Sequence, residues 1–388
     1  MEYIDEINID GKTIILRSDL NVPIQNKKII DNFKIKKSLK TINYLLEKNC
    51  KIILLSHLGK VKTEEDKKNN SLKIVYKELK KQINAKVFFS KELVGTKFEK
   101  KVKNLKQKQI LLLENTRFMD LDNKKESNCD LSLSKYWASF ADLFVMDAFG
   151  SSHRKHTSTY GVGKFLPTSY GLLIKEEINA LNEALQNDKK IVILGGAKIE
   201  DKLNLVKSLL PKSQKILIGG KMCATFLYLK GNKVKKSQVN LEVTESLKKI
   251  YKDNVNKLII PIDIKTNNTE NIKVENLKEE EIFDIGKNTI ELFKQNINKE
   301  DFVVWNGPLG LVENKNYEVG TIEILNYLKQ NDIKTIIAGG DTAAVANKYN
   351  MKFYHISTGG GATLEFLEGK ELPALTLRME VNNEKNNI

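Results

Sequence analysis

Ten short apolar stretches, each followed by polar or glycine residues, recur along this sequence of 388 residues. Amphipathic helical patterns separate them, and within each stretch the apolar residues run on with little alternation. Such runs are typical of parallel strands that helices cover on both faces, so the pattern predicts an α/β fold. The ten stretches are 13–19, 51–57, 110–117, 143–150, 191–198, 215–221, 258–263, 302–308, 335–341 and 353–361.

The stretches form two groups, with a long helical pattern between them that follows Pro167 and Gly171. Two groups of strand–helix units predict two doubly wound parallel-sheet (Rossmann-like) domains joined by a hinge helix. We expect an N-terminal domain over residues 1–173 and a C-terminal domain over 174–373. In open parallel sheets ligands bind beyond the carboxyl ends of the strands, so the residues after each stretch are the candidate site.

The composition narrows the possible partners. The net charge is +15, but lysine is dispersed without aromatic interleaving, so we expect no specific nucleic-acid partner. No apolar run approaches the roughly 20 residues of a membrane helix, so we expect no membrane partner. The acidic N-terminus meets a strand pattern at once, unlike a signal peptide, and the three cysteines are scattered. These features predict a cytoplasmic protein.

Arginine is rare in this lysine-rich chain. Of 64 Lys and Arg residues only four are arginine: Arg17, Arg117, Arg154 and Arg378. A guanidinium binds carboxylate or phosphate through two parallel hydrogen bonds, which lysine does poorly. A structural ion pair is the alternative for any one of them. Because three of the four follow strand-like stretches, we favour anion recognition.

The segment "DAFGSSHRKHTS" (147–158) holds two of the four histidines beside Arg154. His153 and His156 could bind a metal, but no cysteine cluster or second histidine pair completes a site, and Arg154 would repel a cation. Together with Arg117 and His57 on neighbouring strand ends, the segment predicts a cradle for a small, multiply charged anion.

The second group of strand ends carries glycine instead, at 195–196, 219–220, 339–340 and 359–361. Gly-Gly between a strand and a helix lets backbone N–H groups approach a phosphate. Lys198 and Lys202 follow the first turn, and Asp341 follows the third, where a carboxylate could hold Mg²⁺ on a nucleotide. Neither a P-loop nor a G-x-G-x-x-G motif after a strand occurs, which argues against those two nucleotide-binding classes. An anion cradle in one domain and a Mg-nucleotide site in the other predict phosphoryl transfer.

Eight motifs follow one another between about Thr13 and Leu375: "RSDLNVP", "SHLGK", "LLLENTRF", "DAFGSSHRKHTSTYG", "ILGGAKIEDK", "VVWNGPLGLVE", "IIAGGDTAA" and "HISTGGGATLEFLEGKELP". In this order and spacing they resemble the motifs of phosphoglycerate kinases. The resemblance implies reversible transfer of phosphate from 1,3-bisphosphoglycerate to ADP, giving 3-phosphoglycerate and ATP, with Mg²⁺. It also implies a monomer, in-line transfer across a cleft that closes between the domains, and a tail over 374–388 that returns to the N-terminal domain.

The resemblance also implies site residues. The expected phosphoglycerate-binding residues are Asp19, Leu20, Asn21, Lys34, His57, Leu58, Gly59, Lys60, Arg117 and Arg154. The expected nucleotide-binding residues are Gly195, Lys198, Lys202, Gly219, Gly220, Asn306, Pro308, Glu313, Gly339, Gly340, Asp341 and Thr342. Lys34, Lys198 and Arg154 are expected to be catalytic, and Asp341 is the expected metal ligand.

Four positions depart from the family pattern. Lys34 and Lys60 stand where arginine is usual or frequent, and Lys221 and Ala338 each replace one glycine of a Gly-Gly-Gly turn. For Lys34 we weigh a phosphoryl clamp weaker than arginine, compensation by neighbouring lysines, and an ordinary solvated helix lysine. Two rivals to the overall interpretation remain: another α/β kinase acting on a small carboxylate, and a basic binding protein without catalysis.

Overall fold

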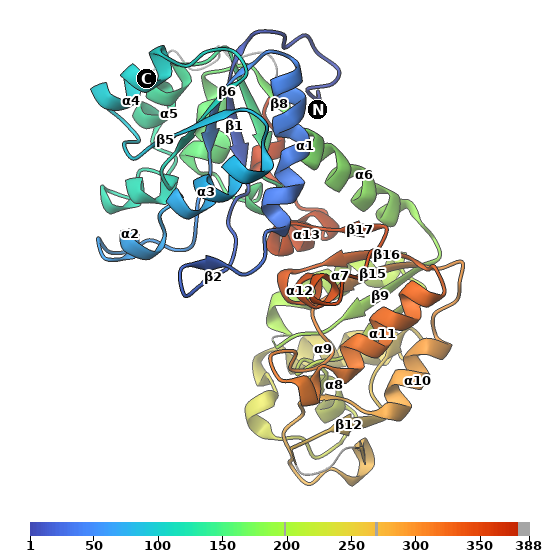
Figure 1. Ribbon diagram of the computed structural model, residues 1–388. Coiled ribbons are helices and arrows are strands. Elements are labelled where there is room, and N and C mark those ends of the chain that lie inside the picture. The colour runs from blue at the N-terminus through green and yellow to red at the C-terminus, as the bar shows by residue number, and fades with distance from the viewer. Residues whose placement is uncertain (198, 268–270, 379–388) are drawn as a thin grey trace. The chain divides into compact units, whose positions relative to one another are not determined.

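The computed structural model describes residues 1–197, 199–267 and 271–378. The described residues form two compact units, one of Met1–Ile178 together with 371–378 and the other within Asn179–Lys370. The division falls inside helix α6 (Leu172–Gln186), whereas the sequence pattern placed the domain boundary at residues 173 and 174. Each unit is a parallel sheet with helices on its faces, so the predicted α/β fold with two parallel-sheet domains is confirmed (Figure 1).

The sheet of the first unit has six strands, and every neighbouring pair is parallel. The apolar strands β1, β4, β6 and β7 lie centrally, as continuous hydrophobic runs require. In sheet order the strands are β5 (Lys86–Ser90), β6 (Gln109–Leu113), β4 (Lys51–Leu55), β1 (Thr13–Ser18), β7 (Leu143–Asp147) and β8 (Thr168–Tyr170).

Helices α1 (Phe33–Glu47) and α3 (Lys73–Gln82) cover one face of this sheet (Figure 1). Ile42 and Leu45 of α1 and Leu79 of α3 are fully buried in one cluster with strand residues such as Ile52. Full burial of such a side chain contributes about 1.5–3 kcal/mol. This packing fixes the strand ends from which the candidate site projects.

The second unit repeats the arrangement, with α10 (Lys287–Gln295), α11 (Val319–Gln330) and α12 (Gly340–Lys348) packed in one core cluster with the sheet. Phe293, Leu325 and Trp305 are fully buried there. In sheet order the parallel strands are β11 (Leu258–Ile259), β10 (Lys215–Ile218), β9 (Lys190–Leu194), β15 (Phe302–Asn306), β16 (Lys334–Ala338) and β17 (His355–Ile356).

Several elements were not predicted from the sequence. The stretch 258–263 divides into β11 and β12 (Asp263–Lys265) around Pro261, which has no N–H to donate to a ladder. Strand β12 belongs to a separate antiparallel sheet with β13 (Ile272–Lys273) and β14 (Asp284–Ile285). The edge strands β5 and β8 were not predicted either, because β5 alternates between buried and exposed residues and β8 has only three residues.

The remaining helices connect the strands. In the part of the chain that the structure describes, no helix is both long and apolar enough to span a membrane. The remaining helices are α2 (Asp66–Asn69), α4 (Thr96–Lys103), α5 (Leu131–Ala138), α7 (Leu203–Leu209), α8 (Cys223–Leu229), α9 (Thr244–Asp253) and α13 (Gly360–Leu367). Strands β2 (Ile24–Gln25) and β3 (Lys28–Ile29) form a small hairpin.

The chain returns to the first unit after Glu371. The N–H of Ala374 donates to the carbonyl of Ser152 at 3.0 Å, and the N–H of Thr168 donates to the carbonyl of Arg378 at 2.8 Å. The hydroxyl of Tyr170 donates to the carbonyl of Leu377 at 2.9 Å. The rest of the expected tail, 379–388, lies outside the described residues.

Candidate active site

The first half of the candidate site lies at the carboxyl ends of β1, β4, β6 and β7. Arg17, near the end of β1, is only 1% exposed and lies buried beneath these strand ends. Its Nε donates to Oγ of Ser158 at 2.9 Å, and one terminal nitrogen lies 2.9 Å from Nδ1 of His57. Arg17 therefore holds two other segments in place and is not itself presented to a ligand.

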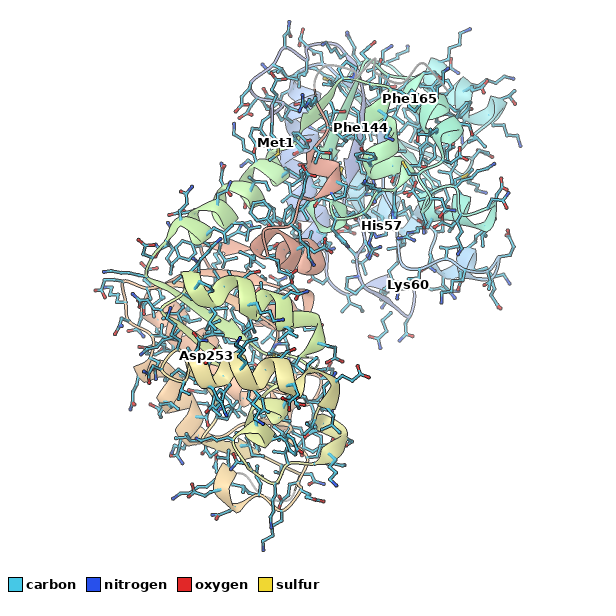
Figure 2. The ribbon with its side chains drawn as sticks, turned by 180° about the vertical axis from the view of Figure 1, so that it is seen from behind. Met1, His57, Lys60, Phe144, Phe165 and Asp253 are labelled. Carbon is cyan, nitrogen blue, oxygen red and sulfur yellow. The ribbon has the colours of Figure 1, made fainter. Side chains whose placement is uncertain are left out.

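His57 is neutral. Burial lowers the pKa of its imidazole well below the usual value, and the adjacent Arg17 lowers it further. Because the guanidinium of Arg17 can only donate, Nδ1 of His57 accepts and Nε2 carries the proton. Figure 2 shows His57 and Lys60 at one end of the first unit, away from Phe144 in the interior. His57 thus offers an N–H donor at the strand ends without adding a charge.

Asp19 and Lys34 form an ion pair next to this histidine. Nζ of Lys34 lies 2.8 Å from Oδ2 of Asp19, and the carboxylate is only 2% exposed. Lys34 is therefore not an ordinary solvated helix lysine. The neighbouring Asn21 accepts the N–H of Gly59 at 2.9 Å, and Gly59 has φ +61°, which favours glycine.

Arg117 follows β6. One terminal nitrogen donates to Asp120 Oδ2 at 3.3 Å and to Ser127 Oγ at 3.0 Å. Its Nε is buried and has no hydrogen-bond partner among the residues that the structure describes. A buried donor without a partner costs free energy, so Arg117 favours the binding of an acceptor from outside the chain.

Arg154 is exposed, and its Nε donates to Nε2 of His153 at 3.0 Å. Burial and Arg154 lower the pKa of His153 to about 4, while burial and Arg117 lower that of His156 to about 3. Both histidines are thus neutral, so the positive charge of this segment comes from Arg154 and Lys155. Because Nε2 of His153 accepts, its Nδ1 carries the proton, and this buried atom has no partner within the described residues.

The other predicted substrate residues have backbone roles in this structure. Leu20 and Leu58 are buried, and their N–H groups donate to Ser56 Oγ at 2.9 Å and Asn115 Oδ1 at 3.2 Å. Lys60 is exposed, and its carbonyl accepts from Asn70 at 3.1 Å.

Sequence reasoning missed Glu126, which is completely buried and accepts from Thr116 and from both the N–H and the hydroxyl of Ser158. Burial raises the pKa of Glu126, against the opposing effect of its hydrogen bonds and of Arg17. It lies in "KKESNCD", where no strand end or motif marked it.

The second half of the candidate site consists of glycine turns packed backbone against backbone. The N–H of Gly196 donates to the carbonyl of Pro308 at 2.7 Å, and that of Gly220 donates to Leu309 at 2.9 Å. A Cβ on Gly195 would lie 2.1 Å from the Pro308 carbonyl oxygen, and one on Gly220 would lie 2.5 Å from the Gly196 nitrogen. Side chains are sterically excluded here, so these glycines are structural requirements of the turn.

Lys202 is buried within these turns. Its ammonium donates to the carbonyls of Gly195 and of Asn306, the latter at 3.0 Å, and it is 8% exposed. Asn306 in turn donates to the carbonyl of Ala338 at 3.0 Å, across to β16. Lys202 thus adds positive charge at the ends of β9 and β15. Lys198, its predicted partner, lies outside the described residues.

Helices α12 and α13 begin beside each other. A Cβ on Gly360 would lie 3.6 Å from Cα of Gly339, whose φ of +105° favours glycine. Helix N-termini carry backbone N–H groups and a partial positive charge, so two of them at one place suit a phosphate. Thr342, in the first turn of α12, has a buried hydroxyl without a partner among the described residues.

A metal would have to be shared with a ligand. Among the described residues no three His, Cys, Asp or Glu side chains converge as a metal site. Mg²⁺ on nucleotide phosphates commonly needs only one or two protein carboxylates, and Asp341, exposed in the first turn of α12, fits that requirement. Glu313, one of the expected nucleotide-binding residues, is also exposed.

One unit thus presents arginines at its strand ends and the other presents glycine turns and helix N-termini, a combination typical of an α/β kinase. Residues 4–370 match the family model of phosphoglycerate kinase. Phosphoglycerate kinase of Staphylococcus epidermidis is 42% identical over 96% of this chain and 98% of its own. That of Fusobacterium nucleatum is 43% identical over the same shares.

Two solved structures are similar in fold. Phosphoglycerate kinase from Coxiella burnetii has a TM-score of 0.82 at 31% identity, and the enzyme from Pyrococcus horikoshii has 0.85 at 30%; each match covers 97% of this chain and 98% of the other. The chain belongs to the phosphoglycerate kinase family. It is a kinase of glycolysis that transfers a phosphoryl group between 1,3-bisphosphoglycerate and ADP.

Proposed function

We propose that the strand ends of the first unit bind the phosphoglycerate, through Arg117, Arg154, Asn21, His57 and the Lys34–Asp19 pair. The observation that carries this assignment is the pair of unpartnered buried donors, Nε of Arg117 and Nδ1 of His153, beside the exposed Arg154. A multiply charged anion would satisfy both donors and give the arginines planar acceptors. Asp19, Leu20, Leu58, Gly59 and Lys60 then shape the loops around the ligand.

The nucleotide belongs to the glycine turns of the second unit. The N-termini of α12 and α13, at Gly339–Gly340 and Gly360, would hold its phosphates, and Thr342 would donate its unpartnered hydroxyl. Asp341 would hold Mg²⁺, which neutralises phosphate charge when bound. The predicted roles of Lys198, Glu313 and Pro308 on the nucleotide complete this assignment.

No residue has to act as a general base. The acceptor in the reverse direction is a carboxylate, which is already ionised at neutral pH. The activation barrier instead comes from bringing anions together. Lys34, Arg154 and Lys198 are our candidates for stabilising the phosphoryl group in the transition state. Direct in-line transfer between the two bound ligands, with water excluded, protects the acyl phosphate from hydrolysis.

The split between the two binding sites can be tested by calorimetry with the whole protein. Titration of 3-phosphoglycerate into Arg117→Lys and Asp341→Ala variants should show weakened binding in the first and unchanged binding in the second. MgADP titration should give the opposite pattern. If both variants lose affinity for the same ligand, the assignment of one ligand to each unit is wrong.

We also propose that the protein acts as a cytoplasmic monomer without a specific nucleic-acid partner. The glycolytic reaction and the dispersed lysines support this view. Sedimentation of the purified protein would test the monomer, and filter binding at physiological salt would test for a sequence-specific nucleic-acid complex.

A further inference from the structure

A cavity of about 670 Å³ in the second unit adjoins the glycine turns. Its lining includes Ala197, which follows Gly195-Gly196, and Lys221, which follows Gly219-Gly220. Ile199 and Met222 supply apolar wall, and Glu281 contributes a carboxylate. The volume is in the range of small-molecule sites and the wall is part apolar and part charged, which suits a purine base.

An ion pair lies within this lining. Nζ of Lys221 lies 3.4 Å from Oε1 of Glu281, and Nζ of Lys235 lies 3.0 Å from Oε2 of the same carboxylate. The hydrogen bond from Lys235, and then that from Lys221, lowers the pKa of Glu281, which is therefore an anion at neutral pH. Because Lys235 fixes the carboxylate from one side, Oε1 keeps its place even when Lys221 turns to another acceptor.

The backbone of Lys221 is fixed by the turn before it. Gly220 has φ +62° and packs against Gly196, and the N–H of Met222 donates to the Gly196 carbonyl at 3.1 Å. Lys221 itself is 38% exposed. The long contact to Glu281 engages one of its three N–H donors, and it is at the outer limit of a hydrogen bond. The pair therefore presents an ammonium donor beside a carboxylate acceptor, on a rigid turn.

We propose that Lys221 and Glu281 recognise the base of the nucleotide and that they favour guanine. The pairing edge of guanine has one carbonyl acceptor, O6, next to two donors, N1–H and N2–H. An ammonium beside a carboxylate matches that order: Lys221 donates to O6 while Glu281 accepts from N1 and N2. Adenine offers one donor and one acceptor on the same edge, so it makes one contact fewer with the pair. The enzyme thus accepts GDP at least as well as ADP.

This inference rests on the proposed nucleotide site at the glycine turns. The experiment measures kcat/KM for GDP and for ADP with 1,3-bisphosphoglycerate, in the unaltered protein and in Glu281→Gln and Lys221→Gly. We expect a GDP/ADP ratio of one or more, falling at least tenfold in each variant, because an amide at 281 keeps only one acceptor oxygen for the two donors of guanine and a glycine at 221 removes the donor to O6. Lys221→Arg should keep the ratio, since it keeps the donor. Glu279→Gln, two residues away and exposed, removes the same charge and should leave the ratio unchanged.

A merely structural role for the pair would lower turnover of both nucleotides together and leave the ratio unaltered, which would overturn the inference. An unaltered protein that prefers ADP would also overturn it, while leaving the proposed function intact. If neither nucleotide is turned over, the proposed function itself fails. Calorimetric titration of GDP and ADP then decides the base preference separately, and tighter ADP binding would contradict it.

Discussion

The ammonium of Lys34 lies 2.8 Å from the carboxylate of Asp19, which is only 2% exposed. Burial alone would raise the pKa of Asp19, but the charge and hydrogen bond of Lys34, together with the charge of Arg17, outweigh that effect and hold the pKa below its usual value. The pair is neutral as a whole, and it fixes the Lys34 ammonium at the end of β1 before any ligand binds. Lys34 keeps further N–H donors for a phosphoryl oxygen, since an ammonium has three.

Lys34 gives the first prediction. If it contacts the phosphoryl group mainly in the transition state, Lys34→Ala should lower kcat by about 100-fold or more while changing both KM values much less. Lys34→Arg should hold or raise kcat. Steady-state kinetics with both substrates measures this.

Loss of Lys34 also leaves Asp19 without its cation, so folding must be checked by thermal unfolding. Lys36→Ala is the matched control, because Lys36 is on the same helix and exposed. A Lys34→Ala enzyme that is folded and turns over like the unaltered protein would show that the charge at this position is not used.

Arg154 is predicted to bind through its planar fork. Arg154→Lys should preserve the fold, since the side chain is exposed, but weaken phosphoglycerate binding about 10- to 100-fold. Calorimetric titration with 3-phosphoglycerate measures the affinity. Equal affinity and equal KM in the variant would remove Arg154 from the site.

Asp341 is predicted to act on the metal. Asp341→Ala should lower kcat and raise the Mg²⁺ concentration needed for half-maximal rate, because the carboxylate no longer shares the ion with the nucleotide phosphates. Affinity for 3-phosphoglycerate should stay nearly constant. A parallel loss of that affinity would mean that Asp341 serves the other ligand.

The low pKa of His156 predicts that the stability of the fold depends on pH. Its pKa is about 3 in the folded protein against an ordinary value of 6.5. Between these values the unfolded chain binds a proton at this residue that the folded chain does not, so stability is lost as the pH falls. His156→Asn keeps a hydrogen-bond acceptor at the helix cap but removes the titration.

Denaturant unfolding at about pH 7 and about pH 5 compares the two proteins. The His156→Asn variant should lose less stability over this interval than the unaltered protein does. An identical loss in both would show that His156 is not held neutral by the fold.

The fold was largely predictable because its signals are local. All ten apolar stretches contain strands, and their order in two groups gave the two sheets. The antiparallel sheet β12–β14 was not predictable, since two of its strands have only two residues each and their pairing depends on distant contacts. The edge strand β5 alternates because one face meets solvent, and Phe88 is accordingly 45% exposed.

The candidate site was predictable in residue type but not in charge state. Arg117, Arg154 and His57 were found from the sequence because they follow predicted strands, and ligands bind beyond the carboxyl ends of parallel strands. The neutral state of His153 and His156 follows from burial and from neighbouring arginines, which no spacing along the sequence reveals. Burial of Lys202 on backbone carbonyls is likewise a consequence of packing.

The catalysed reaction is tested most directly by mixing the purified protein with 1,3-bisphosphoglycerate, ADP and Mg²⁺ and following ATP with a coupled assay. We expect rapid ATP formation that depends on all three additions and that falls sharply in Lys34→Ala. Absence of ATP formation by the folded protein, under conditions in which a known phosphoglycerate kinase is active, would contradict it.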